Sequence, residues 1–404
     1  MIDNLKVENS RELLNSLKIK NFRALQDFEV RKLGRINLIV GKNNSGKSTV
    51  LEALRIFAAK GNPVLLLQIA VEHDEKIWIG NDESILDVLD LPFQNFFSGR
   101  TFPQNDTDEI YIGENNSTKN CSLTISHGYF VEVEEEEKQD NGESLLRTRR
   151  RFLSKKDANN ISSGYPKQAL AVKYGESRNL GIIELEDARR IKSRNIYWES
   201  IESIPCSYIP TQFISVSDLA DIWDNIMFSD YAAFVKKGLT IIAEDFEDLG
   251  FVKSGSQPVM NRSRLEFRRA CKVKLKNQKL AVPLNGLGDG MLRVLQLMLK
   301  IFPAKGGFLL IDEFENGLHY TIQEKVWRLI FDLAEKLDIQ VFATTHSWDC
   351  IESFAKVAVE RTDVEGVLFR VGRSIKTSDQ GKVIATVFEE DKLFSITQAE
   401  VEVR

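Results

Sequence analysis

The sequence predicts an α/β fold in which helices flank a mixed central sheet and a large insertion interrupts the chain. Three observations support this prediction. A glycine-rich loop at residues 41–48 lies between a short apolar run and a stretch with helical spacing. Two more apolar runs, residues 308–311 and 341–343, end in polar residues and flank an amphipathic stretch at residues 320–337. Continuous apolar runs are typical of strands covered on both faces, and strands that alternate with helices favour a parallel arrangement.

The glycine-rich loop reads GKNNSGKS and fits the pattern GxxxxGK followed by Ser or Thr. A strand before it and a helix after it are the context of a phosphate-binding loop. Gly41 and Gly46 allow backbone conformations and close approach that a Cβ would block. The N–H groups of the loop, which includes Asn43, Asn44 and Ser45, then point at an anion at the helix N-terminus.

Two side chains of this loop are assigned to the nucleotide. We expect Lys47 to contact the β- and γ-phosphates and Ser48 to place its hydroxyl on Mg²⁺. A glycine-rich surface turn is the alternative, and the joint presence of strand, helix, Lys and Ser disfavours it.

The apolar run at residues 308–311 ends in Asp312 and Glu313. The carboxyl ends of parallel strands deliver side chains to bound phosphates. We expect this strand to lie beside the strand of the phosphate-binding loop. Asp312 would then hold Mg²⁺, directly or through water, and Glu313 would polarise the attacking water. An ordinary strand-to-loop exit is the weaker alternative, because the phosphate-binding loop is also present.

Two further motifs have positions that suit phosphate contacts. His346 follows the run at 341–343, where a strand-end imidazole can donate a hydrogen bond to a γ-phosphate. Gly288, Asp289 and Gly290 precede a stretch with helical spacing and predict an anion site at a helix start. The alternatives are a histidine that packs or caps a helix, and a plain turn with a helix cap.

Composition limits the class of protein. The 404 residues suffice for two or three structural units, and the 43% hydrophobic content provides for a large core. A formal net charge of −5 excludes a general basic field for nucleic acid. Four dispersed cysteines without a CxxC pair indicate reduced thiols. The sequence shows neither a signal peptide nor an apolar run that spans a bilayer. We expect a soluble cytoplasmic protein without membrane contact.

The rest of the chain is organised around these motifs. We divide it into residues 1–75 with the phosphate-binding loop, 76–215 as an inserted β-rich lobe with charged loops, 216–280 as a helical segment and basic hairpin, and 281–404 with the other motifs. Acidic residues 134–137 and basic residues 147–156 indicate a solvated hairpin with opposite charges on its arms. Apolar residues between 218 and 249 have helical spacing, with Ser217 and Ser229 as candidate caps.

The basic hairpin candidate covers residues 262–280. Lys272, Lys274 and Lys276 alternate with apolar residues, which places the lysines on one strand face. DNA or RNA could bind to that face. A solvated face of a two-sided strand is at least as good an interpretation.

The four motifs, in this order, resemble those of ATP-binding-cassette (ABC) ATPases, and their wide separation resembles the RecF, SMC and OLD (overcoming-lysogenisation-defect) branch. The segments that carry the closer resemblance, to the OLD-like predicted ATPases of bacteria, read LKIKNFRAL, GKNNSGKST, LGDGMLR, LLIDEFENGLH and ATTHS. The resemblance covers roughly residues 17–75 and 205–360. It implies an ABC-type P-loop NTPase head.

The resemblance also implies a mechanism. Two heads dimerise head to tail and enclose two ATP molecules. The residues that act on one nucleotide are then Lys47, Ser48, Thr49, Asp312, Glu313 and His346. Residues 288–290 of the partner head close on its γ-phosphate, and residues 315–319 link the two sites. Gly288 stands where such signatures usually have Ser, so the contact across the dimer can be limited to the backbone. Gln68 and Gln94 are candidates for the glutamine that senses Mg²⁺.

OLD nucleases carry a Toprim nuclease domain after the ATPase, and residues 357–404 are too few for one. We therefore expect a separate effector, a nuclease or toxin, as in bacterial anti-phage systems. The alternative is an ATP-dependent DNA- or RNA-binding clamp of the RecF or SMC type in DNA repair. A GTPase would need an NKxD-type element, and the nearest match, residues 154–157, is not preceded by an apolar strand. A small-molecule kinase would leave His346 and residues 288–290 without a role.

Overall fold

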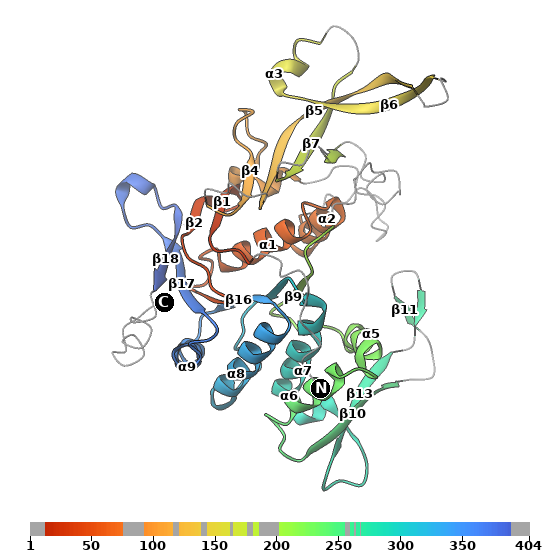
Figure 1. The fold of residues 1–404 in the computed structure, drawn as a ribbon, viewed down its shortest axis with the longest axis vertical. Coiled ribbons are helices and arrows are strands. Elements are labelled where there is room, and N and C mark those ends of the chain that lie inside the picture. Colours follow the sequence, from red (N-terminus) through yellow and green to blue (C-terminus); the bar gives the residue numbers. More distant parts are fainter. Residues whose placement is uncertain are drawn as a thin grey trace.

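The computed structural model describes residues 13–75, 93–115, 121–138, 144–161, 165–175, 181–185, 202–254, 259–261, 264–266 and 268–388. The molecule is elongated (Figure 1). A β-rich lobe forms one end and a group of helices the other, with helix α1 between them (Figure 1).

The central sheet has six strands in the order β18-β17-β3-β16-β15-β9. Their bounds are β3 Ile36–Val40, β9 Cys206–Ile209, β15 Phe308–Ile311, β16 Gln340–Thr345, β17 Gly366–Arg373 and β18 Val383–Phe388. All neighbours are parallel except β17 and β18. Every residue of β3, β15 and β16 is buried, as their apolar runs predict. The predicted fold class, a mixed sheet flanked by helices with a β-rich insertion, is confirmed.

One expectation about this sheet is wrong. The strand that ends in Asp312 does not lie beside β3, because β16, the strand that leads to His346, pairs with both. Strand order depends on how the connecting helices pack, which a local apolar pattern does not report.

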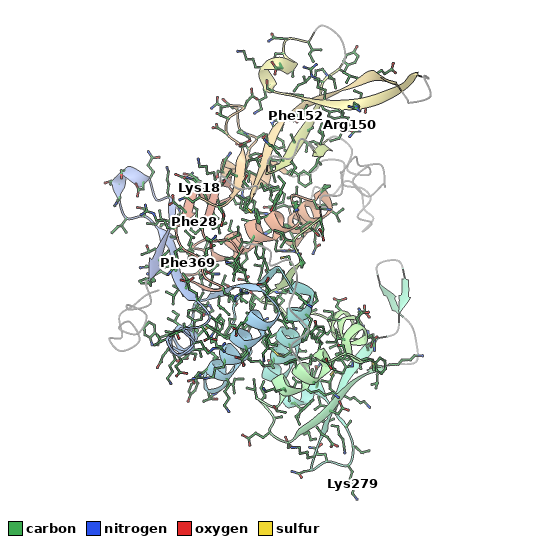
Figure 2. The ribbon with its side chains drawn as sticks, viewed as in Figure 1. Lys18, Phe28, Arg150, Phe152, Lys279 and Phe369 are labelled. Atoms are coloured by element: carbon green, nitrogen blue, oxygen red, sulfur yellow. The ribbon has the colours of Figure 1, made fainter. Side chains whose placement is uncertain are left out.

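The second sheet is antiparallel and has seven strands in the order β2-β1-β4-β5-β7-β8, with β6 paired to β5. Their bounds are β1 Leu17–Phe22, β2 Leu25–Val30, β4 Ile110–Gly113, β5 Ser122–Lys138, β6 Ser144–Leu153, β7 Lys167–Tyr174 and β8 Gly181–Glu184. The predicted charged hairpin is β5–β6, in which Glu132 pairs with Arg150. Figure 2 shows Arg150 and Phe152 on this lobe and Lys279 at the opposite end of the molecule.

Helix α1, Lys47–Ala58, is buried between the two sheets, and one apolar cluster joins them around it. Helices α5 to α9 cover the other face of the central sheet (Figure 1). Their bounds are α5 Val216–Ile226, α6 Tyr231–Leu239, α7 Asp289–Ile301, α8 Tyr320–Lys336 and α9 Trp348–Glu360. Helix α2, Pro63–Glu72, follows α1, and α3, Lys155–Ala158, follows β6. Short 3₁₀ turns are η3 Phe93–Phe96, η4 Ser98–Arg100, η5 Leu284–Leu287, η6 Phe302–Ala304 and η7 Thr377–Asp379.

The segment between residues 216 and 280 differs from expectation in two ways. The helical pattern ends early, because α6 stops at Leu239 and strand β10, Phe246–Lys253, begins within the stretch 218–249 that was expected to be helical. One cap is also displaced, because Ser215 and not Ser217 caps α5. Ser229, the other predicted cap, accepts the N–H of Tyr231, the first residue of α6, at 3.3 Å. An apolar residue every third or fourth position fits a helix, but the same residue can also begin a buried strand.

The basic segment is not an independent hairpin. Strand β13, Arg269–Leu275, pairs mainly with β10 and briefly with β14, Val282–Pro283. A separate pair, β11 Val259–Asn261 and β12 Arg264–Glu266, precedes it, and residues 262, 263 and 267 lie outside the described chain. The predicted alternation is confirmed, since Cys271, Val273 and Leu275 are buried and the lysines between them face outward.

The segment expected as an inserted lobe, 76–215, contributes to both sheets. Strands β4 to β8 extend the antiparallel sheet begun by β1 and β2, and β9 forms an edge of the central sheet. Residues 154–157 follow β6, which is rich in arginine and is therefore not the apolar strand that a GTPase element would need. There Ser154 caps the short helix α3, in the β-rich lobe (Figure 1).

Candidate active site

The phosphate-binding loop connects the end of β3 to the start of α1. A Cβ on Gly41 would lie 2.3 Å from the carbonyl oxygen of Val371 and 2.8 Å from Oγ of Ser45, so only glycine fits. Gly46 has φ of 105° and Asn44 has φ of 60°, both in the left-handed region. The loop therefore curls tightly around the start of α1, whose first N–H groups have no helical partner.

Lys47 is folded back over this loop. Its Nζ donates to the carbonyl oxygens of Gly41 at 2.8 Å and Lys42 at 3.0 Å. Burial lowers the pKa of Lys47, while the carboxylates of Asp312, Glu313 and Glu315 favour the charged form. Because neutral carbonyls are its hydrogen-bond acceptors, the ammonium charge is available to an anion.

Asp312 is the centre of a hydroxyl cluster. Ser48 Oγ donates to its two carboxylate oxygens, at 3.2 and 3.1 Å, and Thr344 Oγ1 donates to Oδ1 at 2.6 Å. Thr211 Oγ1 lies 3.3 Å from Oδ2. Asp312 is only 8% exposed, so these contacts hold its carboxylate in one place.

These groups suit a nucleotide and Mg²⁺. The glycines allow the tight loop whose N–H groups can surround a phosphate, and the buried Ser45 hydroxyl has no hydrogen-bond partner in the described chain. Hydroxyl and carboxylate oxygens are the donors that Mg²⁺ prefers, usually one or two carboxylates plus phosphate oxygens. Among the described residues there is no cluster of three or more His, Cys, Asp or Glu side chains that could hold a metal alone.

Glu313 and His346 lie beside this cluster. Glu313 has φ of 48°, and its N–H donates to Thr344 Oγ1 at 2.8 Å. His346 Nδ1 lies 3.8 Å from Glu313 Oε1 and 3.1 Å from Glu315 Oε1. Glu315 also accepts the backbone N–H of His346 at 2.9 Å. Glu315, which the sequence assigned only to a linking loop, is thus the main partner of the histidine.

Residues 288–290 do not join this group. Gly288 and Asp289 are exposed at the start of α7. Their side of the helix faces the turn after Glu313, since a Cβ on Gly290 would lie 3.1 Å from the carbonyl oxygen of Gly317. No described hydrogen bond or ion pair links residues 288–290 to the phosphate-binding loop.

The sequence missed the contribution of β9. This strand runs parallel to β15 and ends at Ile209, so Thr211, two residues later, reaches Asp312 and the exposed Gln212 follows. The sequence contains a pattern that could have identified this strand end, because a short apolar run precedes the polar pair Thr211-Gln212. Neither glutamine named from the sequence contacts Asp312. Gln68 donates to Glu72 on α2, and Gln94 lies in η3.

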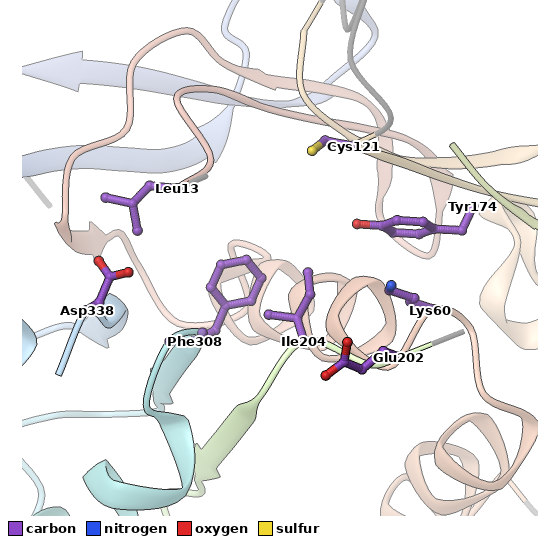
Figure 3. Close-up of a pocket in the computed structure, with 10 residues that line it drawn as sticks. Leu13, Lys60, Cys121, Tyr174, Glu202, Ile204, Phe308 and Asp338 are labelled. Carbon is purple, nitrogen blue, oxygen red and sulfur yellow. The ribbon is translucent and has the colours of Figure 1, made fainter. Parts of the chain in front are cut away.

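A separate cavity of about 320 Å³ lies at the opposite end of these elements (Figure 3). Phe308, which begins β15, and Lys60, which follows α1, line it together with Tyr174 of β7 and Cys121, the residue before β5. Asp312 follows the other end of β15 and Lys47 begins α1, so the cavity is distinct from the phosphate-binding loop.

Residues 36–349 match the family model described as an AAA domain, putative AbiEii toxin, Type IV TA system. The chain belongs to this family. The matched region runs from the first residue of β3 into α9 and therefore contains every residue of the AAA domain site described above. The predicted P-loop ATPase-type core is confirmed at this level, and the OLD-like assignment stays a prediction.

Relatives of this AAA domain include a protein of Helicobacter pylori named ATP/GTP phosphatase. It is 22% identical over 364 residues, which cover 86% of this chain and 89% of the relative. An uncharacterized protein of Methanocaldococcus jannaschii is 39% identical over 80 residues, 19% of this chain and 36% of that protein.

Solved structures also align with the AAA domain. A structure of an SMC head bound to the C-terminal winged-helix domain of ScpA has a TM-score of 0.46 at 14% identity and covers 95% of this chain and 100% of that chain. The SMC head domain from Thermotoga maritima has a TM-score of 0.40 at 15% identity and covers 94% and 100%. Within the described residues, every helix is too short or too polar to cross a bilayer.

Proposed function

We propose that this chain binds ATP with Mg²⁺ and hydrolyses it. The observation that carries the proposal is the hydrogen bond between Ser48 and Asp312, residues 264 positions apart in the sequence. It joins the phosphate-binding loop to the acidic end of β15, the two halves that a nucleoside triphosphate site needs. The name of the Helicobacter pylori relative, ATP/GTP phosphatase, supports hydrolysis of a nucleoside triphosphate.

The loop residues bind the phosphates. Backbone N–H groups between Gly41 and Thr49, including those of Asn43, Asn44 and Ser45, surround the β-phosphate at the start of α1. Lys47 releases its contacts to the loop carbonyls and binds the β- and γ-phosphates. Ser48 and Asp312 would hold Mg²⁺, which when bound neutralises phosphate charge and orients the γ-phosphate for in-line attack.

Glu313 and His346 act on the reacting end. Glu313 accepts a proton from the attacking water, whose oxygen bonds to the γ-phosphorus while the bond to the β-phosphate oxygen breaks. His346, held by Glu315, donates a hydrogen bond to the γ-phosphate. Gln212, one residue after Thr211, takes the role of the metal-sensing glutamine that Gln68 and Gln94 were expected to fill.

The finer proposal concerns assembly. Two copies pack head to tail, so that Gly288, Asp289 and Gly290 of one copy close on the γ-phosphate bound by the other. The exposure of Gly288 and Asp289, and the absence of a described contact to their own phosphate-binding loop, support this arrangement. ATP-driven dimerisation then controls a separate effector, a nuclease or toxin, in anti-phage defence of the OLD-like type. The toxin–antitoxin wording of the family description supports such a context.

Nucleic-acid binding in a RecF- or SMC-like clamp is the second candidate, favoured by the outward-facing Lys272 and Lys276 on and after β13. The same face also carries acids, because Asp248 lies opposite Lys274 and Asp224 binds Arg269. If the face binds DNA or RNA, the logarithm of the binding constant falls linearly with the logarithm of the salt concentration. Replacing Lys272, Lys274 and Lys276 by Gln should make this slope shallower, by about 1 for each phosphate contact that is lost. An unchanged slope rejects this candidate.

Phosphate release from ATP and from GTP, with and without Mg²⁺, tests the main proposal. We expect Mg²⁺-dependent turnover of ATP by the wild-type chain. Lys47→Ala should lose both nucleotide binding and turnover, because the phosphates lose their cation. Glu313→Gln should bind ATP normally but turn it over about 10²- to 10⁴-fold more slowly, because it removes the general base. Normal turnover by Glu313→Gln would contradict the assignment.

A further inference from the structure

A buried arginine lies beneath the turn at Asp312 and Glu313 and has no role in the site as described so far. Arg293 is on α7 and is fully buried. A guanidinium is charged at neutral pH, and burying a charge is costly unless hydrogen bonds or opposite charges compensate for it. Packing of the hydrophobic core therefore does not explain why an arginine occupies this position.

The hydrogen bonds of Arg293 end at the nucleotide site. Nη1 donates to the carbonyl oxygen of Pro210 at 2.9 Å, and Nη2 donates to those of Asp312 and Glu313, each at 2.9 Å. These three carbonyls lie at the carboxyl ends of two neighbouring parallel strands, β9 and β15. One planar fork thus joins both strand ends and the turn that carries the two acidic residues.

The turn needs such support. Glu313 has φ of 48°, which lies in the left-handed region. This conformation is unfavourable for a residue that has a Cβ, and it persists only where the surrounding structure enforces it. Thr344 holds the N–H of Glu313 from one side. Arg293 holds the carbonyl groups on both sides of the strained residue, those of Asp312 and Glu313.

The positive charge of Arg293 also interacts with the acidic residues of the site. Burial lowers its pKa to about 10, so it remains protonated at neutral pH, and Glu315, Asp312 and Glu313 favour the charged form. Among the described residues no ion pair involves Arg293, whose hydrogen bonds go to neutral carbonyl oxygens. Its Nε has no hydrogen-bond partner either, so the fork makes all its contacts through the carbonyls.

We propose that Arg293 is a positioning residue that fixes the backbone of Asp312 and Glu313 and ties this turn to the start of α7. The inference rests on the proposed ATPase function, since the turn is the one that carries the general base. Because Gly288, Asp289 and Gly290 lie within two turns of Arg293 on the same helix, a partner that binds them also acts on the turn through this side chain.

The test compares Arg293→Lys with a matched control, Gln296→Met. Gln296 is on the same helix, is equally buried, and neither amide atom of its side chain has a hydrogen-bond partner in the described chain. Lysine keeps the positive charge, but its single Nζ cannot bridge both strand ends as the fork does. Both changes alter a buried polar side chain of α7, and only one touches the turn.

We expect Arg293→Lys to lower kcat by about 10²-fold, because a small displacement of a catalytic group has this effect. The KM for ATP should change by less than about twofold, because the phosphate-binding loop is untouched. The amides of Glu313 and Phe314 should exchange hydrogen faster than in the wild type, without nucleotide present. Gln296→Met should leave kcat and the exchange of both amides unchanged.

Wild-type kcat in Arg293→Lys, or a fall in kcat that Gln296→Met shares, overturns the proposal. If Arg293→Lys does not fold, hydrogen exchange of the wild-type protein remains decisive: the Glu313 and Phe314 amides must be as protected as the core of α7, and fast exchange there overturns the proposal. If the wild type hydrolyses no nucleotide, the proposed function fails, while the exchange data still report whether Arg293 fixes the turn.

Discussion

At the residue scale, the site depends on hydroxyl groups that hold a carboxylate. Thr344 Oγ1 donates to Asp312 Oδ1 and accepts the N–H of Glu313, so one hydroxyl orients both acidic residues. This is a positioning role that Ser can fill and an isosteric apolar residue cannot.

Thr344→Val should therefore destabilise the protein, although the shape of the side chain is kept. Removing the hydroxyl leaves the buried N–H of Glu313 without an acceptor, which costs about 1–3 kcal/mol of unfolding free energy. Thr344→Ser keeps the hydroxyl and should lie closer to the wild type. Urea unfolding of the three proteins measures the difference. Equal stability of the Val and Ser variants would show that the bonds to Asp312 and Glu313 contribute nothing.

A second prediction concerns pH and a histidine outside the site. His127 on β5 is buried and stacks on Phe102, with ring centroids 3.9 Å apart. Burial, and then the charge of Lys155, lower its pKa from 6.5 to about 4. The unfolded chain therefore takes up the proton first, so stability is complete above pH 6.5 and falls as the pH drops towards 4.

The expected loss over that window is on the order of 3 kcal/mol of unfolding free energy. His127→Phe keeps the ring stack on Phe102 and removes the titrating group. We compare the unfolding free energies of wild type and variant from pH 7.5 to about pH 4. Their difference separates the contribution of His127 from that of the carboxylates, which both proteins share. A difference that stays constant with pH would show that the pKa of His127 is not lowered in the folded protein.

The residues that sequence analysis identified are those whose neighbours in the chain reveal them. Lys47 and Ser48 follow a glycine-rich loop, and Asp312 and Glu313 end an apolar run. Arg293 acts through a contact to the end of a strand that only the fold brings beside it, and no local pattern distinguishes it from other residues of its helix. Such roles appear only when strand order is known.

At the element scale, the apolar runs located the strands but not their order. The run before Asp312 and the run before His346 look alike, because both are buried on two faces. Only the packing of the connecting helices decides that β16 lies next to β3. The segment Gly61-Asn62-Pro63 illustrates the same limit. It ends α1 as proline and glycine predict, yet Asn62 caps a new helix that Pro63 begins.

The β5–β6 hairpin gives an element-scale prediction. Figure 1 shows it extending away from the central sheet. Glu134 pairs with Thr148, so residues 135–147 can be replaced by the two-residue turn Asn-Gly without changing the register. We expect unchanged ATP affinity and unchanged Mg²⁺-dependent turnover, because the site residues lie on other elements. Equilibrium binding and phosphate release measure both. A loss of ATP affinity in a variant that unfolds at the wild-type temperature would show that the hairpin takes part in the site.

At the scale of the whole molecule, the two sheets share one helix. Helix α1 starts at the phosphate-binding loop and is buried between the central and antiparallel sheets, in a single apolar cluster. If the proposed nucleotide binding displaces the loop, both sheets should respond, because a packed core does not deform continuously. The cavity lined by Lys60 and Phe308 lies where the far end of α1 meets the antiparallel sheet (Figure 3).

The last prediction tests whether two copies share each site. In a head-to-tail dimer, Lys47→Ala destroys the phosphate-binding loop of its own chain but leaves its residues 288–290 intact. Asp289→Trp does the reverse, because it disrupts the exposed helix start that its chain offers to the partner's nucleotide and leaves its own loop intact. Each variant alone should be inactive. In a mixed dimer, the loop of the Asp289→Trp chain meets the intact helix start of the Lys47→Ala chain, which rebuilds one complete site.

Mixing equal amounts of the two variants should therefore restore activity. With random pairing, half of the dimers are mixed and each has one of its two sites intact, so about a quarter of the wild-type rate of phosphate release is expected. Restoration should also depend on protein concentration, because it requires association. If every site were complete within its own chain, the mixture would stay inactive at all concentrations, since no chain would carry both an intact loop and an intact helix start.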